Sequence, residues 1–361
     1  MVYYYSKYRN NTKKKKSRFR RFLLVFLLIA LVVCCIIGYR LFVTIYKSNV
    51  WLADQDTVSV YIPTNSNFEE VKKILYSQGI IIERGTFEWL AEKKSYPNSI
   101  KSGKYLVRNG MSNDELINLL RSGDQEPVRL IFNSERNLNR LVRTIAKQIE
   151  PDSADLINLL NDSVYVSKFG FSPDNVSILF VPNTYHIFWD VTAEQFLERM
   201  NSEYERFWNG DRKNLCDSVN MTIPEVVTLA SIVEKETSKT DEKAKIAGVY
   251  INRLKRNWYL QADPTLIFAH SDYNIKRVLN KHKNIDSPYN TYTNKGLPPG
   301  PICLPSISSI DAVLNYDKHK YFYFCAKDDL SGYHSFSKTN AQHNQNARKY
   351  RKALDNLNIR K

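Results

Sequence analysis

An uncharged, apolar run near the N-terminus constrains the fold of this chain more than any other feature. Residues 22–39 read FLLVFLLIALVVCCIIGY and carry no charged side chain. Their number is close to what an α-helix needs to cross the hydrocarbon core of a bilayer. Tyr39, Tyr46 and Trp51 suit the aromatic belt at a membrane interface. We therefore predict one transmembrane helix, an anchor over residues 22–46.

The charges before that run predict its orientation. Residues 1–21 contain nine lysines and arginines and no acidic residue, and basic segments of this kind stay in the cytoplasm. We predict a basic cytoplasmic arm over residues 1–21, a single-pass protein of the inner (cytoplasmic) membrane, and a periplasmic or otherwise extracytoplasmic remainder. A cleaved signal peptide is disfavoured, since the run is long and no small-x-small site follows it. A lipoprotein cysteine at Cys34 is disfavoured because bulky Val33 precedes it.

The overall charge does not indicate nucleic-acid binding. The chain has 361 residues and a formal net charge of +15, and more than half of that excess lies in residues 1–21. Nucleic-acid binding needs basic side chains gathered on a folded face. No nucleic-acid partner is therefore predicted.

The usual signatures of cofactor sites are absent from the sequence. The five cysteines are scattered without metal-ligand spacing, so we expect buried thiols, and a disulfide among Cys216, Cys303 and Cys325 stays open. The chain has no phosphate-binding glycine loop, no metal constellation and no serine–histidine triad. Neither a cofactor nor a metal is predicted.

A small α/β module is expected after a linker over residues 47–57. Within residues 58–125, TVSVYI alternates like a strand, NFEEVKKILYSQG and TFEWLAEKK have the spacing of helices, and GKYLVR is a second strand. Ser112 and Glu115 form the capping box of a further helix that ends near Gly123. Compact strand–helix–helix–strand modules resemble the LysM-like glycan-binding unit, so a LysM-like module is predicted here.

Residues 126–361 are expected to form a larger α+β region. VRLIF reads as a strand, LNRLVRTIAKQI as a helix, and SILFVPNTYHI as an extended run that reaches a turn at Pro182–Asn183. Near the C-terminus, two short strands predict a hairpin around Asp328–Gly332, followed by a polar helix from about Thr339 to Leu357. The whole chain is therefore assigned to the α+β class.

The segment from Thr222 to Thr265 carries the strongest candidates for chemistry. Its first half, TIPEVVTLASIVEKET, opens with a capping box from Thr222 to Glu225 and continues with apolar residues at helical spacing. That spacing places Glu234 at the edge of a buried face, where loss of water raises the pKa of a carboxyl toward that of a general acid. Glu236 shares an apolar stripe as well, so periodicity does not choose between the two glutamates. An exposed or ion-paired glutamate is the competing interpretation, since lysines lie close by.

Two further stretches offer groups that could hold a sugar. LQADPT can direct Gln261, Asp263 and Thr265 into a cleft, although Asp-Pro-Thr is also common turn chemistry. The loop SPYNTYTNKGLPPGPI (287–302) is too rich in proline and glycine for a regular element. Its amides, hydroxyls and rings suit sugar binding, and a rigid structural loop is the alternative. The candidates in this loop are Tyr289, Asn290 and Tyr292.

Six short segments occur in series along the chain. They are LASIVEKET (229–237), YINRL (250–254), LQADPT (260–265), SPYNTY (287–292), GLPPGPI (296–302) and FSKTNAQHN (336–344). Their order and approximate spacing resemble the membrane-bound endolytic murein transglycosylases, the YceG-like or MltG family. The resemblance indicates a YceG-like catalytic region over residues 126–361 with its core at 222–355. A transmembrane anchor and a LysM-like unit also belong to that family's pattern.

The resemblance implies a substrate, a reaction and a catalytic residue. The substrate would be peptidoglycan, cut within nascent glycan strands at the bond from N-acetylmuramic acid to N-acetylglucosamine. The C6 hydroxyl of the muramic acid would attack its own C1 and form a 1,6-anhydro ring, so water is not activated and one carboxyl group suffices. The motif assigns the role of general acid and base to Glu234. The predicted substrate contacts are Glu236, Gln261, Asp263, Thr265, Tyr289, Asn290 and Tyr292.

A second hypothesis and one departure from the family pattern complete the interpretation. A non-catalytic, membrane-anchored, peptidoglycan-binding scaffold would recruit cell-wall synthases through the same anchor and LysM-like unit, and synthases are candidate partners in either case. The family commonly has a Pro-Asp-Thr-Tyr turn, whereas this chain has Asn183 after Pro182. No acid–base role is therefore assigned to that turn.

Overall fold

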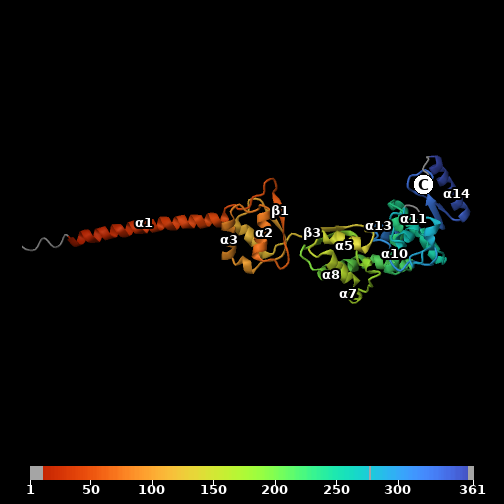
Figure 1. Ribbon diagram of the computed structural model, residues 1–361, viewed down its shortest axis with the longest axis horizontal. Coiled ribbons are helices and arrows are strands. Elements are labelled where there is room, and N and C mark those ends of the chain that lie inside the picture. The colour runs from red at the N-terminus through yellow and green to blue at the C-terminus, as the bar shows by residue number, and fades with distance from the viewer. Residues whose placement is uncertain (1–10, 276–277, 357–361) are drawn as a thin grey trace, which may run out of the picture. The chain divides into compact units, whose positions relative to one another are not determined.

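The computed structural model describes residues 11–275 and 278–356. The chain divides into two compact units, residues 1–127 and 128–361, and each is described by itself. Helices predominate, and the strands of the described residues form separate two-stranded antiparallel sheets (Figure 1). The mixed α+β composition expected from the sequence is confirmed.

The N-terminal helix α1 (Asn11–Tyr46) contains a stretch that is long and apolar enough to cross a membrane. This stretch covers Phe19–Tyr46, 28 residues, or about 42 Å of helix, against roughly 30 Å of hydrocarbon in a bilayer. Its large apolar side chains are exposed, including Leu24 and Phe26 at 66% and 60%. A core helix of a soluble protein would bury such side chains. The helix can therefore act as the predicted anchor, although residues 1–10 of the basic arm lie outside the described residues.

The first unit continues with a small module in the predicted order of strand, helix, helix and strand. Strand β1 pairs with β2 so that Val60 lies opposite Tyr105, and both side chains are fully buried. The predicted Ser112–Glu115 capping box is present. The resemblance to LysM-like units stays a prediction. The elements are β1 (Thr57–Ile62), α2 (Phe68–Ser77), α3 (Arg84–Lys93), η1 (Tyr96–Asn98), β2 (Gly103–Arg108) and α4 (Asn113–Ser122).

Residues 48–52 were expected to belong to a linker, yet they pack into this module. Val50 and Leu52 are 1% and 8% exposed, and the amides of Asn49 and Val50 both donate to the Met111 carbonyl. The side-chain amide of Asn49 donates to Oδ1 of Asn113 at 2.7 Å, and the Asn113 amide donates to the Thr44 carbonyl of α1 at 2.9 Å. Buried side-chain hydrogen bonds thus join the end of α1 directly to the module.

Replacing Asn113 with alanine should loosen this junction. The change removes buried hydrogen bonds and leaves the Asn49 amide short of a partner, which should cost about 2 to 3 kcal/mol. Hydrogen–deuterium exchange should then become faster over residues 47–52. Asn118→Ala on the exposed face of the same helix is the control and should leave exchange unchanged. Equal protection in the two variants would contradict a structural role for Asn113.

The second unit begins with the strand pair β3 (Val128–Phe132) and β4 (Asn183–Ile187), which is covered by short helices. The predicted turn at Asn183 is wrong, because Asn183 pairs with Phe132 and starts β4. Tyr185 is buried against the Phe132 ring, and this burial favours the strand over a turn. The other elements here are α5 (Leu138–Ala146), α6 (Ser153–Asn161), α7 (Ser163–Ser167), η2 (Val176–Leu179), α8 (Ala193–Trp208) and α9 (Asp211–Val219).

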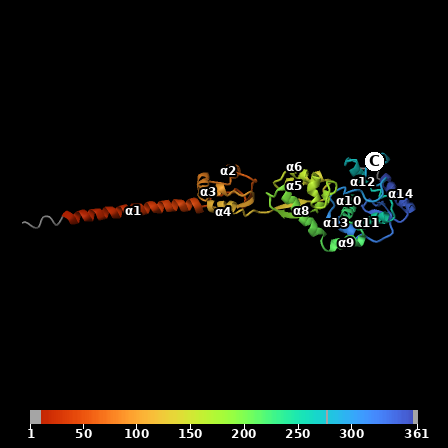
Figure 2. The same cartoon turned by 90° about the horizontal axis from the view of Figure 1, so that it is seen from below.

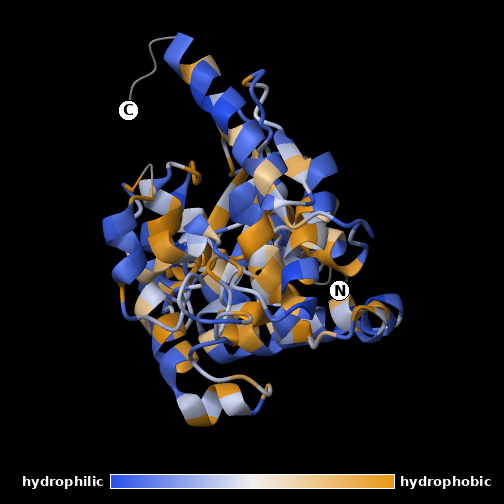
Figure 3. Ribbon diagram, turned by 90° about the vertical axis from the view of Figure 1, so that its right-hand side faces the viewer, coloured by the Kyte–Doolittle hydropathy of each residue, from blue (hydrophilic) through white to orange (hydrophobic). Residues whose placement is uncertain are grey.

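Helix α10 (Ile223–Glu236) lies at the centre of the second unit, against α11 (Thr240–Lys255) and α13 (Ile307–Leu314) (Figure 2). Its residues from Val226 to Val233 are all buried, so the helix is covered on every side rather than along one stripe. Helix α14 has no buried residue and is mostly hydrophilic (Figure 3). The remaining elements are α12 (Asp263–Ala269), η3 (Asn280–Asn284), β5 (Tyr323–Ala326), β6 (His334–Ser337) and α14 (Asn340–Asn356).

Candidate active site at the end of helix α10

The buried helix α10 ends on the two glutamates that the sequence could not distinguish. The capping box from Thr222 to Glu225 starts the helix, and Thr237 caps its C-terminus. Residues two apart in an α-helix point about 200° away from each other. Glu234 and Glu236 therefore face opposite sides of the helix and meet different surroundings.

Glu234 is held by three side-chain donors and by the backbone amide of Ser306, all on one carboxylate oxygen. Its Oε2 accepts from Lys243 Nζ at 2.9 Å and from the hydroxyls of Ser306 and Ser309 at 2.5 Å each. These bonds connect α10 with α11 and with the start of α13. Its side chain is 17% exposed, and that of Lys243 is 6% exposed.

The prediction that burial gives Glu234 a raised pKa is wrong in this setting. Burial does raise it, but the hydrogen bonds from Ser306, Ser309 and Lys243, together with the lysine's charge, lower the pKa below its ordinary value. Glu234 is thus a carboxylate at neutral pH.

For Glu236, the effects that raise the pKa outweigh those that lower it. It is partly buried, and its Oε1 accepts a hydrogen bond from the Tyr250 hydroxyl at 2.5 Å. Burial raises the pKa of Glu236 to about 7, with a further upward contribution from Asp263, while the Tyr250 bond and the charge of Arg253 lower it. The carboxyl that can both give and take a proton near neutral pH is therefore Glu236.

Two of the predicted substrate contacts lie beside Glu236. Asp263 starts α12, and its Oδ1 accepts a hydrogen bond from the Tyr292 hydroxyl at 2.5 Å. Glu236 and Asp263 both contribute to a raised pKa of Tyr292, after the larger effects of burial and of the hydrogen bond to Asp263. We call Glu236, Tyr250, Asp263 and Tyr292 the glutamate cluster.

The side chains of two other predicted substrate contacts form hydrogen bonds within the chain. Thr265 is fully buried, and its hydroxyl donates to the Ala262 carbonyl at 2.8 Å and lies 2.9 Å from Oγ1 of Thr291. Asn290 is also fully buried, and its amide donates to two carbonyls of the segment just before the loop, those of Lys283 and Ile285. As placed here, Thr265 and Asn290 support the loop over residues 287–302 and do not face solvent.

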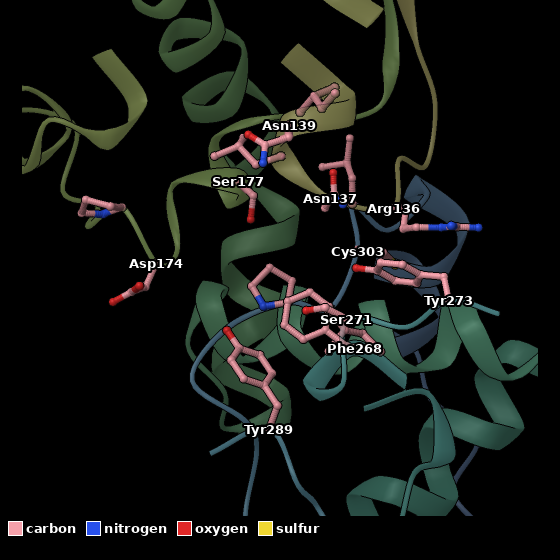
Figure 4. Close-up of a pocket in the computed structure, with 16 residues that line it drawn as sticks. Arg136, Asn137, Asn139, Asp174, Ser177, Phe268, Ser271, Tyr273, Tyr289 and Cys303 are labelled. Carbon is pink, nitrogen blue, oxygen red and sulfur yellow. The ribbon is translucent and has the colours of Figure 1, made fainter. Parts of the chain in front are cut away.

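Residues of that loop line two separate cavities. The first, of about 290 Å³, is lined by the predicted Tyr289 and by Arg136, whose guanidinium lies 4.4 Å from the centre of the Tyr273 ring (Figure 4). The second has about 350 Å³ and contains the predicted Gln261. Neither Glu234 nor Glu236 lines either cavity. The second cavity is lined by Arg253, Asn257, Trp258, Tyr259, Gln261, Lys295 and Tyr323.

Several residues that shape the site gave little signal in the sequence. Lys243 and Tyr250 reach the glutamates only because α11 folds back on α10. Tyr250 does belong to the segment YINRL, whereas Lys243 and Ser306 belong to none of the six motifs. Among the described residues, no group of His, Cys, Asp and Glu could hold a metal ion, and the cysteines there are free thiols. The arrangement can perform proton transfer by a carboxyl group among hydroxyls.

Comparison with known proteins supplies the family. The YceG-like family matches residues 60–349. The chain is 32% identical to an endolytic murein transglycosylase of Bacillus subtilis, covering 81% of this chain and 85% of that protein. An endolytic murein transglycosylase of Streptococcus pneumoniae is 28% identical over 80% of this chain, which spans only 57% of that longer relative.

A solved structure agrees with these matches. The crystal structure of a putative yceG-like protein from Listeria monocytogenes aligns with a TM-score of 0.54 and 27% identity, and the alignment covers 80% of this chain and 98% of that one. The family match extends over most of the chain and includes both glutamates of α10, the loop over residues 287–302 and both cavities. This chain belongs to the YceG-like family.

Proposed function

We propose that this protein is an endolytic lytic transglycosylase of peptidoglycan. Its family membership and the names of its relatives support the substrate class and the enzyme class. The finer proposal is cleavage of the bond from N-acetylmuramic acid to N-acetylglucosamine with a 1,6-anhydro end. The observation that carries it is Glu236, a carboxyl with a pKa of about 7 that accepts a hydrogen bond from the Tyr250 hydroxyl.

The reaction needs one group that changes its protonation state twice. Protonated Glu236 donates to the departing glycosidic oxygen as the bond to C1 breaks. The C6 hydroxyl of the same muramic acid bonds to C1, and its proton passes to the Glu236 carboxylate, which restores the acid. No water is consumed, so the second carboxylate that hydrolytic glycosidases use to activate water or attack C1 is not required. Asp263 favours the acid form of Glu236 before each turnover.

The family resemblance assigned this role to Glu234, and the geometry favours Glu236 instead. Glu234 would have to leave three donors and take up a proton against a lowered pKa. Its bonds suit a positioning role, because they hold the C-terminal turn of α10 against α11 and α13. Glu236 lies on the same turn, so this clamp also sets the direction of Glu236.

The chain around this site is proposed to work at the membrane. Helix α1 would anchor it in the cytoplasmic membrane with the N-terminus inside, so that both folded units lie on the outer side, where nascent strands are made. The LysM-like module would bind glycan, and cell-wall synthases are proposed partners.

Replacing Glu234 and Glu236 with glutamine, one at a time, tests which of the two residues is catalytic. With peptidoglycan sacculi as substrate, Glu236→Gln should lower the yield of 1,6-anhydromuramoyl ends by about 10² to 10⁴. Glu234→Gln should keep measurable activity but lower the thermal midpoint, because Lys243 loses its charged partner. Mass spectrometry of the products and a thermal denaturation curve give the two readouts.

The reverse pattern would return the catalytic role to Glu234. That pattern is an inactive but equally stable Glu234→Gln and an active Glu236→Gln. Ends with free reducing muramic acid would indicate hydrolysis, and binding of glycan without any cleavage by the wild-type protein would favour the scaffold hypothesis.

The pH dependence should follow the acid form of Glu236. A general acid acts when protonated, so kcat/KM should fall as the pH rises through about 7. Asp263→Asn removes a charge that raises the pKa of Glu236, and the falling limb should therefore move to lower pH. Asp311→Asn is the control, because its carboxylate pairs with Arg212 and is not among the charges that shift the pKa of Glu236. A limb that stays in place in Asp263→Asn would contradict this assignment.

A further inference from the structure

We propose that the second cavity binds the anionic stem peptide of a glycan strand. This inference rests on the proposed function and deepens it, because it names the part of the substrate that this cavity recognises. Seven residues line the cavity, and they comprise two cations, three aromatic rings and two amides, with no carboxylate among them. A ligand with negative charge and apolar surface matches that set.

Among the described residues, the cations around the cavity form no salt bridge. Lys295 is exposed, and its ammonium lies 5.7 Å from the centre of the Tyr259 ring. The Arg253 guanidinium donates only to backbone carbonyls, those of Phe322 and Leu260. Arg256 lies over the Trp258 and Phe322 rings rather than beside a carboxylate. Among the described residues, no carboxylate forms a salt bridge with any of these three side chains, and the exposed ammonium of Lys295 is available to a ligand.

Aromatic faces give the cavity its apolar surface. Trp258 and Tyr259 are 39% and 38% exposed, which is high for large rings in a folded unit. Tyr323 is backed by the His343 ring, with the ring centres 5.5 Å apart. Rings of this kind pack against sugar and peptide surfaces, and an adjacent cation strengthens contact with an anionic group.

The cavity adjoins the glutamate cluster. Arg253 lines the cavity, and its charge also lowers the pKa of Glu236. Gln261 lines it two residues before Asp263, and the Gln261 amide donates to the Thr291 carbonyl of the loop that carries Tyr292. The cavity is thus connected to the proposed acid through Arg253 and through the segment that carries Asp263.

The backbone of the cavity wall is held in an uncommon conformation. Asn257 and Gln261 have φ values of +52° and +50°, in the left-handed region that residues other than glycine seldom adopt. Such strain persists where surrounding contacts enforce it, and it gathers at functional sites. Trp258 and Tyr259, two of the rings that line the cavity, lie in the segment between these two residues.

The chemistry of peptidoglycan indicates which part of the substrate carries negative charge. Its sugar rings are N-acetylated and neutral, and the lactyl group of muramic acid is amide-linked to the stem peptide. Negative charge on the strand is carried by the carboxylates of that peptide. A cavity with unpaired cations beside the proposed acid would thus position muramic acid residues that carry an acidic peptide, and would favour those strands over neutral ones.

Neutralising the peptide carboxylates tests this preference. The full-length protein in detergent is given glycan strands with native acidic peptides and the same strands after chemical amidation of their carboxylates. The wild-type kcat/KM should be roughly fivefold or more higher on the acidic strands, and this ratio should shrink as salt screens the charges. Lys295→Gln should bring the ratio close to one.

Lys255→Gln is the matched control. Lys255 is also exposed and lies 5.2 Å from the centre of a tyrosine ring, that of Tyr316, but it lines neither cavity. It should keep the wild-type ratio. A wild-type ratio near one, or a ratio that Lys295→Gln leaves unchanged, would overturn the proposal.

A binding measurement separates this inference from the proposed function. Fluorescently labelled acidic and amidated strands are titrated with the Glu236→Gln protein, with and without Lys295→Gln, and anisotropy reports the Kd. A charge preference that depends on Lys295 supports the inference even if the wild-type protein cleaves nothing. Cleavage to 1,6-anhydro ends with no such dependence in Kd or kcat/KM would leave the function intact and refute the stem-peptide site.

Discussion

Hydrogen bonds from three side chains to one oxygen of Glu234 hold the last turn of α10 in place, and the geometry of the site depends on that clamp. A partly buried carboxylate is costly unless charge and hydrogen bonds compensate it. Lys243 from α11 and two serines at the start of α13 provide this compensation. Because three elements meet at one atom, the direction of α10 at its end is closely defined.

This clamp also affects Glu236, which lies on the other side of the same helical turn. Glu236 receives one hydrogen bond from a neutral hydroxyl and no hydrogen bond from a cation, so burial dominates and raises its pKa to about 7. The pKa of Glu234 is thus lowered and that of Glu236 raised, although only Lys235 separates the two residues. The difference arises from the partners each meets, since the local sequence around them is nearly the same.

The loop over residues 287–302 connects this cluster to both cavities. Its Tyr289 lines the first cavity, Tyr292 bonds to Asp263 in the glutamate cluster, and Lys295 lines the second cavity. Asn290 and Thr291, buried beneath these side chains, bond to the chain around them and keep the loop in one shape. A loop without regular structure can present side chains in three directions because its own polar groups are satisfied internally.

The sequence alone was enough to predict the apolar anchor, the capping boxes at Ser112 and Thr222, the C-terminal hairpin and the family motifs. Those features depend on residues a few positions apart. The choice between Glu234 and Glu236 depends on Lys243, Tyr250 and Ser306, which lie 9 to 72 residues away along the chain. Only the tertiary structure brings these groups together, and a carboxyl's pKa responds to whichever charges and donors surround it in space. The burial of Thr265 and Asn290 and the packing of residues 48–52 were decided in the same way, by contacts that no local pattern records.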